Sequence, residues 1–126
     1  LKDYSGRGES ILIVDDIESQ REIARSILER LNYSTGVVDA GEKVLEYLDK
    51  HKTDLIILDM IMEPGIDGLE TCQRVFNKHP DMPVIIASGY SESEKVRSSL
   101  KLGAKKYIKK PYSIETLGTT IKNTLT

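Results

Sequence analysis

The sequence predicts an α/β domain of the (βα)5 type, in which five strands form a doubly wound parallel sheet with helices on both faces. Three nearly continuous apolar runs of strand length support this prediction: 10–14 (SILIV), 54–58 (DLIIL) and 82–87 (MPVIIA). Such runs are typical of parallel strands that are covered on both faces. Segments of helical periodicity lie between them, so each strand is followed by a helix that leads back to the next parallel strand.

The remaining elements follow from weaker patterns. Two shorter strands fit residues 33–38 and 105–109, and a helix with a thin apolar stripe fits residues 91–102. Residues 1–9 are polar and glycine-containing, so we expect a linker there and one domain over residues 10–126. Four further helices are indicated by apolar residues at helical spacing: Ile23, Ile27, Leu28 and Leu31; Val44, Leu45 and Leu48; Leu69, Cys72, Val75 and Phe76; and Ile114, Leu117, Ile121 and Leu125.

Composition narrows the class of protein. A chain of 126 residues and 14.1 kDa has room for one domain. Eighteen Lys and Arg against twenty Asp and Glu give a net charge of −2, which disfavours a dedicated nucleic-acid-binding surface. Cys72 is the only cysteine, so we expect no internal disulfide and a cytoplasmic location. The chain starts with Leu1 rather than Met, which suggests a piece of a longer protein.

Chemically active side chains follow four of the predicted strands. In an open parallel sheet, ligands bind outside the carboxyl ends of the strands, so residues at those ends share one edge. Directly after the strands stand Asp15 and Asp16, then Asp59, then Ser88, and finally Lys110. We therefore expect these five side chains to converge.

Three carboxylates, a hydroxyl and an ammonium group at one edge suit phosphoryl transfer. Two unit charges 4 Å apart repel by about 4 kcal/mol at an effective dielectric constant of 20, so clustered carboxylates call for a cation. Mg²⁺ prefers oxygen ligands and often completes its coordination with a phosphate. A carboxylate can act as the nucleophile, while the lysine and the hydroxyl can hold phosphoryl oxygens. The sequence therefore predicts a Mg²⁺-dependent aspartyl-phosphate site.

Five motifs, taken in chain order, resemble the receiver domain of two-component response regulators. They are ILIVDD (11–16), DLIILDM (54–60), PGIDG (64–68), the Ser88 of IIASG, and YIKKPY (107–112). The resemblance covers about residues 9–126 and makes residues 10–126 a receiver domain. It implies a flavodoxin-like fold with strand order 2-1-3-4-5, and a domain that catalyses its own phosphorylation and dephosphorylation.

The resemblance implies a role for each residue of the site. Asp59 would accept a phosphoryl group from the phosphohistidine of a histidine kinase or a histidine phosphotransfer domain. Asp16 and Asp59 would bind Mg²⁺ directly, and the backbone carbonyl of Ile61 would supply a further ligand. Asp15 would act mainly through water, and Lys110 would pair with the phosphoryl oxygens.

The same resemblance implies a conformational switch. Ser88 would hydrogen-bond the phosphoryl group and Tyr107 would follow it inward, which changes the surface formed by the last two helices and the last strand. The peptide bond before Pro111 is expected to be cis. The bulky side chains of Ile61 and Tyr90 would hinder an attacking water, so slow loss of the phosphoryl group is expected.

One residue departs from the family's pattern. Most receivers read D-x-x-M-P-G-x-D-G, whereas Glu63 is inserted here between Met62 and Pro64. Two interpretations are open: a surface insertion that costs little in closure entropy, or a residue that adjusts access to the metal or the kinase. The segments GRGESILIVDD, DMIMEPGIDG and YIKKPYS together most resemble receivers at the C-terminus of hybrid histidine kinases.

Particular residues argue against other partners and other functions. Nucleic acid is not expected as a partner, because the lysines of residues 105–110 alternate between two faces without an aromatic stacking platform. A membrane is not expected either, because no apolar run approaches the ~20 residues that a membrane span needs. A weak homodimer is left open. A haloacid-dehalogenase-like phosphatase would need an Asp where Ile61 stands. A flavodoxin-like flavin-binding module would need a glycine-rich phosphate loop in place of DDIESQ (15–20). The third alternative is a degenerate receiver that acts as an interaction module without phosphorylation.

Overall fold

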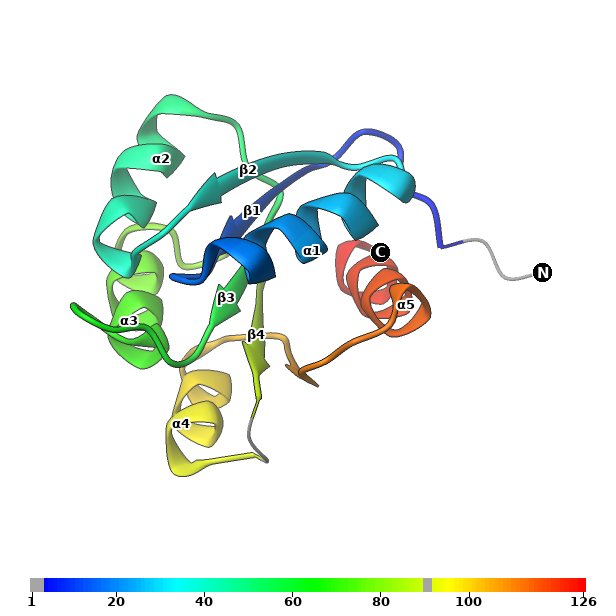
Figure 1. The fold of residues 1–126 in the computed structure, drawn as a ribbon. Helices are drawn as coiled ribbons and strands as arrows, with labels where there is room; N and C mark the ends of the chain where they lie inside the picture. Colours follow the sequence, from blue (N-terminus) through cyan, green and yellow to red (C-terminus); the bar gives the residue numbers. More distant parts are fainter. Residues whose placement is uncertain (1–3, 90–91) are drawn as a thin grey trace.

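The computed structural model describes residues 4–89 and 92–126, in which strands and helices alternate along the chain (Figure 1). The strands are β1 (Ser10–Val14), β2 (Ser34–Val38), β3 (Leu55–Asp59), β4 (Val84–Ser88) and β5 (Lys106–Lys109). The helices are α1 (Glu18–Arg30), α2 (Val44–Lys50), α3 (Gly68–Lys78), α4 (Glu94–Leu102) and α5 (Ile114–Leu125), with a short 3-10 helix, η1 (Gly41–Lys43), before α2.

The sheet is parallel throughout, with the strand order β2-β1-β3-β4-β5. This confirms the predicted (βα)5 fold and its strand order. Successive residues of β1 point to opposite faces, so that Ile11 and Ile13 join one core cluster while Leu12 and Val14 join the other. Every residue of β3 and β4 is buried, which is why these strands read as continuous apolar runs.

Helices cover both faces of the sheet (Figure 1). On one face, Leu28 of α1 and Ile121 of α5 are buried against the odd-numbered residues of β1. On the other face, Val44, Cys72 and Val96 bring α2, α3 and α4 into the second core cluster. The predicted site residues lie at one end of the sheet: Asp15 and Asp16 follow β1, Asp59 ends β3, Ser88 ends β4 and Lys110 follows β5.

Some strand boundaries differ from the sequence-based prediction. β4 begins at Val84 rather than Met82, because Pro83 has no N–H to contribute to the sheet. β3 and β4 each continue one residue further than predicted, so that Asp59 and Ser88 are the last residues of their strands. Their backbones are therefore positioned by the sheet and not by a loop.

Two helices differ in detail from the prediction. Helix α4 begins at Glu94, where Ser93 caps it by accepting a hydrogen bond from the Val96 N–H at 3.2 Å; Tyr90 and Ser91 lie outside the described residues. Apolar spacing placed Ile23 and Ile114 on the core-facing sides of α1 and α5, and this is wrong, since they are 51% and 38% exposed. Ile114 is the first residue of α5, whereas Ile23 lies inside α1, whose buried residues are Ala24 and Leu28.

Part of the segment before β1 packs against the domain. Of the predicted linker, the first three residues lie outside the described residues. Tyr4 packs against the core cluster beneath α5. The Gly6 N–H donates to the Leu31 carbonyl at 2.6 Å, and Lys122 Nζ of α5 donates to the Ser5 carbonyl at 3.2 Å. Composition does not reveal these contacts because most of them are made by the backbone.

Candidate functional site

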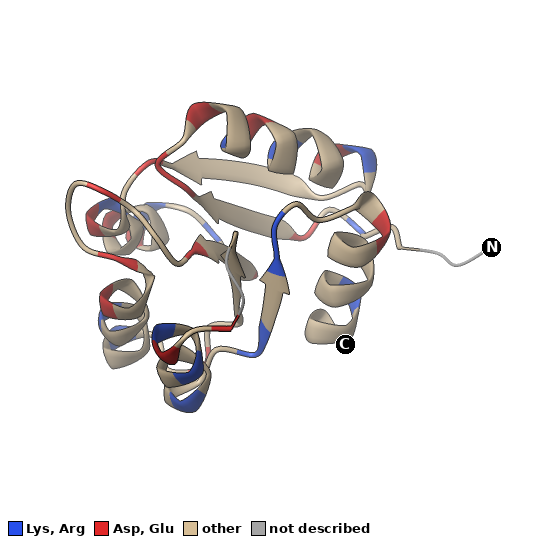
Figure 2. Cartoon of the chain, turned by 60° about the horizontal axis from the view of Figure 1, so that its bottom comes forward, with Lys and Arg blue, Asp and Glu red and all other residues tan. Residues whose placement is uncertain are grey.

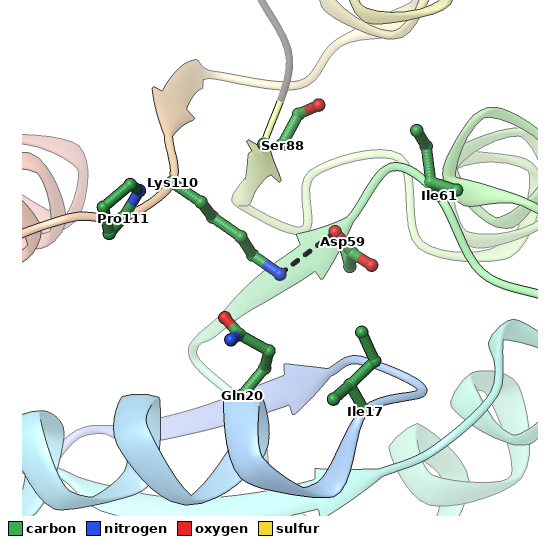
Figure 3. A pocket seen from close by; sticks show the side chains of 8 residues that line it. Ile17, Gln20, Asp59, Ile61, Ser88, Lys110 and Pro111 are labelled. Atoms are coloured by element: carbon green, nitrogen blue, oxygen red, sulfur yellow. Dashed lines mark ion pairs between the residues drawn. The ribbon is translucent and has the colours of Figure 1, made fainter.

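A lysine lies between two carboxylates at the carboxyl ends of the strands. Lys110 Nζ is 2.6 Å from Asp15 Oδ2 and 3.2 Å from Asp59 Oδ1, and the three side chains are between 6% and 14% exposed. Figure 3 shows the Lys110 side chain reaching from the end of β5 toward Asp59. Figure 2 shows acidic segments after β1 and β3 at the same end of the sheet as the basic segment that ends β5.

Asp15 is held by both its side chain and its backbone. Its Oδ1 accepts a hydrogen bond from the Ile17 N–H at 3.0 Å, and its Oδ2 accepts one from Lys110. Its backbone carbonyl accepts a hydrogen bond from Arg21 Nη1 at 2.9 Å. The orientation of the loop after β1 is therefore determined by residues of α1 and of the loop after β5.

Asp16 has an oxygen to spare for a cation. Its Oδ1 is buried and has no hydrogen-bond partner among the described residues, while its Oδ2 accepts a hydrogen bond from the Glu63 N–H at 3.3 Å. One oxygen each from Asp15, Asp16 and Asp59 lies within 4.8 Å of the others. A buried carboxylate oxygen without a partner is costly, and an all-oxygen donor set suits Mg²⁺, so the residues present fit that ion.

Burial and neighbouring charges alter the acidity of two groups. Burial raises the pKa of Asp59 to about 6, and the charges of Asp15 and Asp16 add to this effect while Lys110 opposes it. Burial acts to lower the pKa of Lys110, but its hydrogen bond to Asp15 and the charges of Asp59 and Asp15 outweigh burial and raise that pKa. At neutral pH the lysine is therefore charged and Asp59 is largely ionised.

A cavity of about 450 Å³ opens beside Asp59. Its walls combine polar groups with apolar side chains from the loops after four strands and from the start of α1 (Figure 3). The lining residues are Ile17, Gln20, Asp59, Ile61, Ser88, Gly89, Lys110 and Pro111. Asp59 is thus accessible to a small group from outside, although it is only 8% exposed.

The structure brings most of the predicted site residues together, but it does not place Tyr107 on the cavity wall. Ser88 is buried at the end of β4, whereas the half-buried Tyr107 belongs to β5, beside Ile86 of β4, and packs against the core cluster of α3 and α4. The Lys110–Pro111 peptide bond is cis, which confirms that expectation; the Glu63–Pro64 bond is cis as well.

Two contributions were missed by the sequence reasoning. Arg21, which holds the Asp15 carbonyl, lies in the first turn of α1. A positive side chain is unfavourable at that end of the helix dipole, and this is the signal that could have singled it out. The contact of the Glu63 N–H with Asp16 could not be foreseen, because it depends on the path of a loop.

The chain belongs to the response regulator receiver domain family. The model of that family matches residues 11–122. The match includes the carboxylates at the ends of β1 and β3, and the lysine after β5. Members of this family act in two-component phosphorelays and interact with histidine kinases or phosphotransfer proteins.

The chain is also similar in sequence to curated proteins. The chain is 36% identical to a probable transcriptional regulator, ycf27, of Cyanidium caldarium, covering 94% of this chain and 47% of that protein. It is 35% identical to the 3′,5′-cyclic-nucleotide phosphodiesterase regA of Dictyostelium discoideum, covering 91% of this chain and 15% of that protein. The chain thus spans less than half the length of both. It is 32% identical to sporulation initiation phosphotransferase F of Bacillus subtilis, covering 93% of this chain and 94% of the relative.

Solved structures agree with the fold. A CheY-like receiver domain protein from Methanospirillum hungatei superposes with a TM-score of 0.87 at 29% identity and covers 94% of both chains. The receiver domain of a signal transduction histidine kinase from Syntrophus aciditrophicus gives a TM-score of 0.83 at 33% identity, covering 94% of this chain and 90% of that one. Within residues 4–89 and 92–126, no helix has the length and apolar character that a membrane span requires.

Proposed function

We propose that Asp59 accepts a phosphoryl group from the phosphohistidine of a histidine kinase or a histidine phosphotransfer domain. The observation that carries this proposal is the position of Asp59. Its carboxylate lies at the end of β3 beside the cavity, within 3.2 Å of the Lys110 ammonium group and close to Asp15 and Asp16. The site thus combines a nucleophile, Asp59, with the Lys110 ammonium group, which can bind phosphoryl oxygens. The clustered carboxylates are possible ligands for a metal ion.

The chemistry follows from these groups. An Asp59 oxygen attacks phosphorus, the bond between phosphorus and the imidazole nitrogen breaks, and the imidazole keeps the electron pair and takes up a proton. Lys110 turns from the carboxylates to the new phosphoryl oxygens, where its charge is needed. Asp16, Asp59 and the Ile61 carbonyl would hold Mg²⁺, with Asp15 acting mainly through water. When bound there, Mg²⁺ would neutralise part of the negative charge on the phosphoryl oxygens.

The switch is proposed to run from Ser88 to the face of α4 and β5. Ser88 is the last residue of β4 and lines the cavity, which supports this role. Its hydroxyl points away from Asp59 in Figure 3 and would turn toward the phosphoryl oxygen that it bonds. Tyr107 packs against the cluster that includes Val96 of α4, and a change at Ser88 would be transmitted through that packing. Phosphorylation shifts this equilibrium only by as much as the two states differ in affinity for the phosphoryl group.

An apolar rim around the cavity suits a docked partner. Ile17 and Ile61 are 52% and 48% exposed, and both line the cavity with Pro111. Exposed aliphatic side chains that lie together on a surface are typical of interaction sites. We expect the partner surface that bears the phosphohistidine to cover this rim, which would exclude water during transfer.

The origin of the chain is part of the proposal. We propose that it comes from a hybrid histidine kinase in the cytoplasm. The resemblance to the receiver domain of the Syntrophus kinase, at 33% identity, supports this, and the single buried Cys72 fits a reducing compartment. Sequencing the reading frame that surrounds the coding region tests the origin, with a kinase core in the same frame as the expected result.

Phosphorylation by a small donor tests the central claim. Acetyl phosphate and Mg²⁺ should add one phosphoryl group to the protein, which intact mass spectrometry detects. Asp59→Asn should stay unmodified, while Asp49→Asn, at an exposed carboxylate that pairs with Lys78 on the surface, should be modified like wild type. An unmodified wild-type protein would support the degenerate receiver instead.

A further inference from the structure

The loop between β3 and α3, residues 60–67, contains the inserted Glu63 and projects beside the start of α2 (Figure 1). Its two ends are fixed by packing and by charge. Met62 is 3% exposed and belongs to a core cluster. Asp67 caps α3 and pairs with Lys95 of α4 at 2.6 Å. Between these points the side chains are exposed or half-buried, so the course of the loop there depends on its backbone contacts.

Two carboxylates from other loops hold that backbone. Asp16 accepts the Glu63 N–H at 3.3 Å, and Glu42 of η1 accepts the Ile66 N–H at 3.1 Å. Gly65, with φ 109°, lies against Glu42, since a Cβ at this position would be 2.9 Å from Glu42 Oε1. The inserted residue therefore lies in a stretch that is held on both sides by acidic side chains.

We propose that Glu42 is a positioning residue for the cation site. By holding Ile66, it keeps the longer loop where Glu63 donates to Asp16 Oδ2. Asp16 then keeps its buried Oδ1, which has no hydrogen-bond partner in the described part of the chain, for the metal ion. The inference rests on the proposed function, because it concerns the same Mg²⁺.

The physical reason lies in the length of the loop. A longer loop has more conformations to lose when it is fixed, so a side-chain oxygen that accepts the Ile66 N–H limits the conformations open to it. Glu42 belongs to the 3-10 helix between β2 and α2, so its bond ties the loop to an element that the sheet already positions.

Three variants separate a hydrogen-bonding role of Glu42 from an effect of its charge. Glu42→Gln keeps an oxygen that can accept the Ile66 N–H but removes the charge, and Glu42→Ala removes both. Glu46→Ala is the matched control. Glu46 is an exposed carboxylate of α2, whose Oε1 lies 3.9 Å from Lys50.

NMR on ¹⁵N-labelled protein measures Mg²⁺ affinity and amide exchange on the same sample. We expect Glu42→Ala to weaken Mg²⁺ binding about three- to tenfold, as expected for the loss of one such hydrogen bond. Exchange of the Ile66 and Glu63 amides should also be faster in the metal-free protein. Glu42→Gln and Glu46→Ala should stay within about twofold of wild type in both measurements.

Several outcomes would overturn the proposal. One is that wild type binds Mg²⁺ and Glu42→Ala binds it with the same affinity. Another is an equal loss in Glu42→Gln and Glu42→Ala, which would show that only charge matters. If wild type binds no Mg²⁺, the proposed function fails, and amide exchange decides on Glu42 alone. Faster exchange at Glu63 in metal-free Glu42→Ala then supports the positioning role, and unchanged exchange rejects it.

Discussion

Lys110 Nζ lies 2.6 Å from Asp15 Oδ2, and this ion pair connects two loops that are 95 residues apart in the chain. The lysine is 14% exposed and the aspartate 6%. In a site with three carboxylates, a buried ammonium group offsets part of their repulsion. The residue expected to hold phosphoryl oxygens thus holds the loops after β1 and β5 together before any phosphoryl group arrives.

Lys110→Met should destabilise the metal-free protein by roughly 3 kcal/mol at pH 8, because it leaves buried carboxylates without their counter-charge. Mg²⁺ should then stabilise the variant more than it stabilises wild type, since the cation replaces the lost charge. Urea unfolding with and without Mg²⁺ measures both effects. Lys109→Met, at the exposed neighbouring lysine, should behave like wild type; a similar loss in both variants would contradict a specific role for Lys110.

The stability of the metal-free protein should depend on the protonation of Asp59. Its pKa in the folded state, about 6, is above its ordinary value of 3.8, so the folded protein binds the proton more tightly than the unfolded chain does. The resulting stabilisation is fully present below about pH 4 and is lost as the pH rises through 6. Since a tenfold change in proton affinity equals about 1.4 kcal/mol, the loss is on the order of 3 kcal/mol.

Asp59→Asn isolates this effect, because the other titrating groups are the same in both proteins. The difference in unfolding free energy between wild type and variant should change between pH 4 and pH 7 in urea titrations. With saturating Mg²⁺ the change should shrink, since the ion favours the ionised carboxylate. A constant difference across this pH range in the absence of Mg²⁺ would contradict the prediction.

The thiol of Cys72 should be unreactive in the folded protein. Burial raises its pKa to about 12, and the side chain lies in the core cluster of α2, α3 and α4. At pH 8, modification by a thiol reagent such as DTNB should therefore follow the urea unfolding transition. A Cys72→Ala, Lys101→Cys double variant, which moves the thiol to an exposed position of α4, should react at once. Rapid labelling of native wild type would contradict this.

Gly118→Ala should reduce stability although alanine favours a helix. A Cβ at Gly118 of α5 would lie 2.7 Å from Tyr4 Cβ and 3.1 Å from Leu31 Cδ1. The gain in helix propensity of about 1 kcal/mol is then offset by overpacking of about 1–3 kcal/mol. Thermal and urea unfolding measure the net loss.

Deleting residues 1–5 provides the control for this prediction, because it removes Tyr4. In the shortened protein, Gly118→Ala should become neutral or stabilising, and the coupling between the two changes measures the contact between the N-terminal segment and α5. An equal effect of Gly118→Ala in both proteins would show that Tyr4 does not pack against Gly118.

Much of the fold could be predicted because its signals are local in the chain. The continuous apolar runs of β1, β3 and β4 indicate strands covered on both sides, and helical spacing lies between them. The candidate site could be predicted for the same reason. Once the sheet is parallel, any polar residue at the end of a strand reaches the same edge, so Asp15, Asp16, Asp59, Ser88 and Lys110 are grouped by topology alone.

Contacts between loops could not be predicted from the sequence. No periodic pattern in the sequence predicts the ion pair of Lys110 with Asp15 or the hydrogen bond from the Ile66 N–H to Glu42. Each contact joins two segments whose distance in space depends on how the helices pack on the sheet. The same is true of the docking of Tyr4 against α5. The order of the strands along the chain and their apolar pattern therefore establish which groups meet at one edge of the sheet. Tertiary packing decided which oxygen faces which donor, because that depends on distances of a few tenths of an ångström between distant parts of the chain.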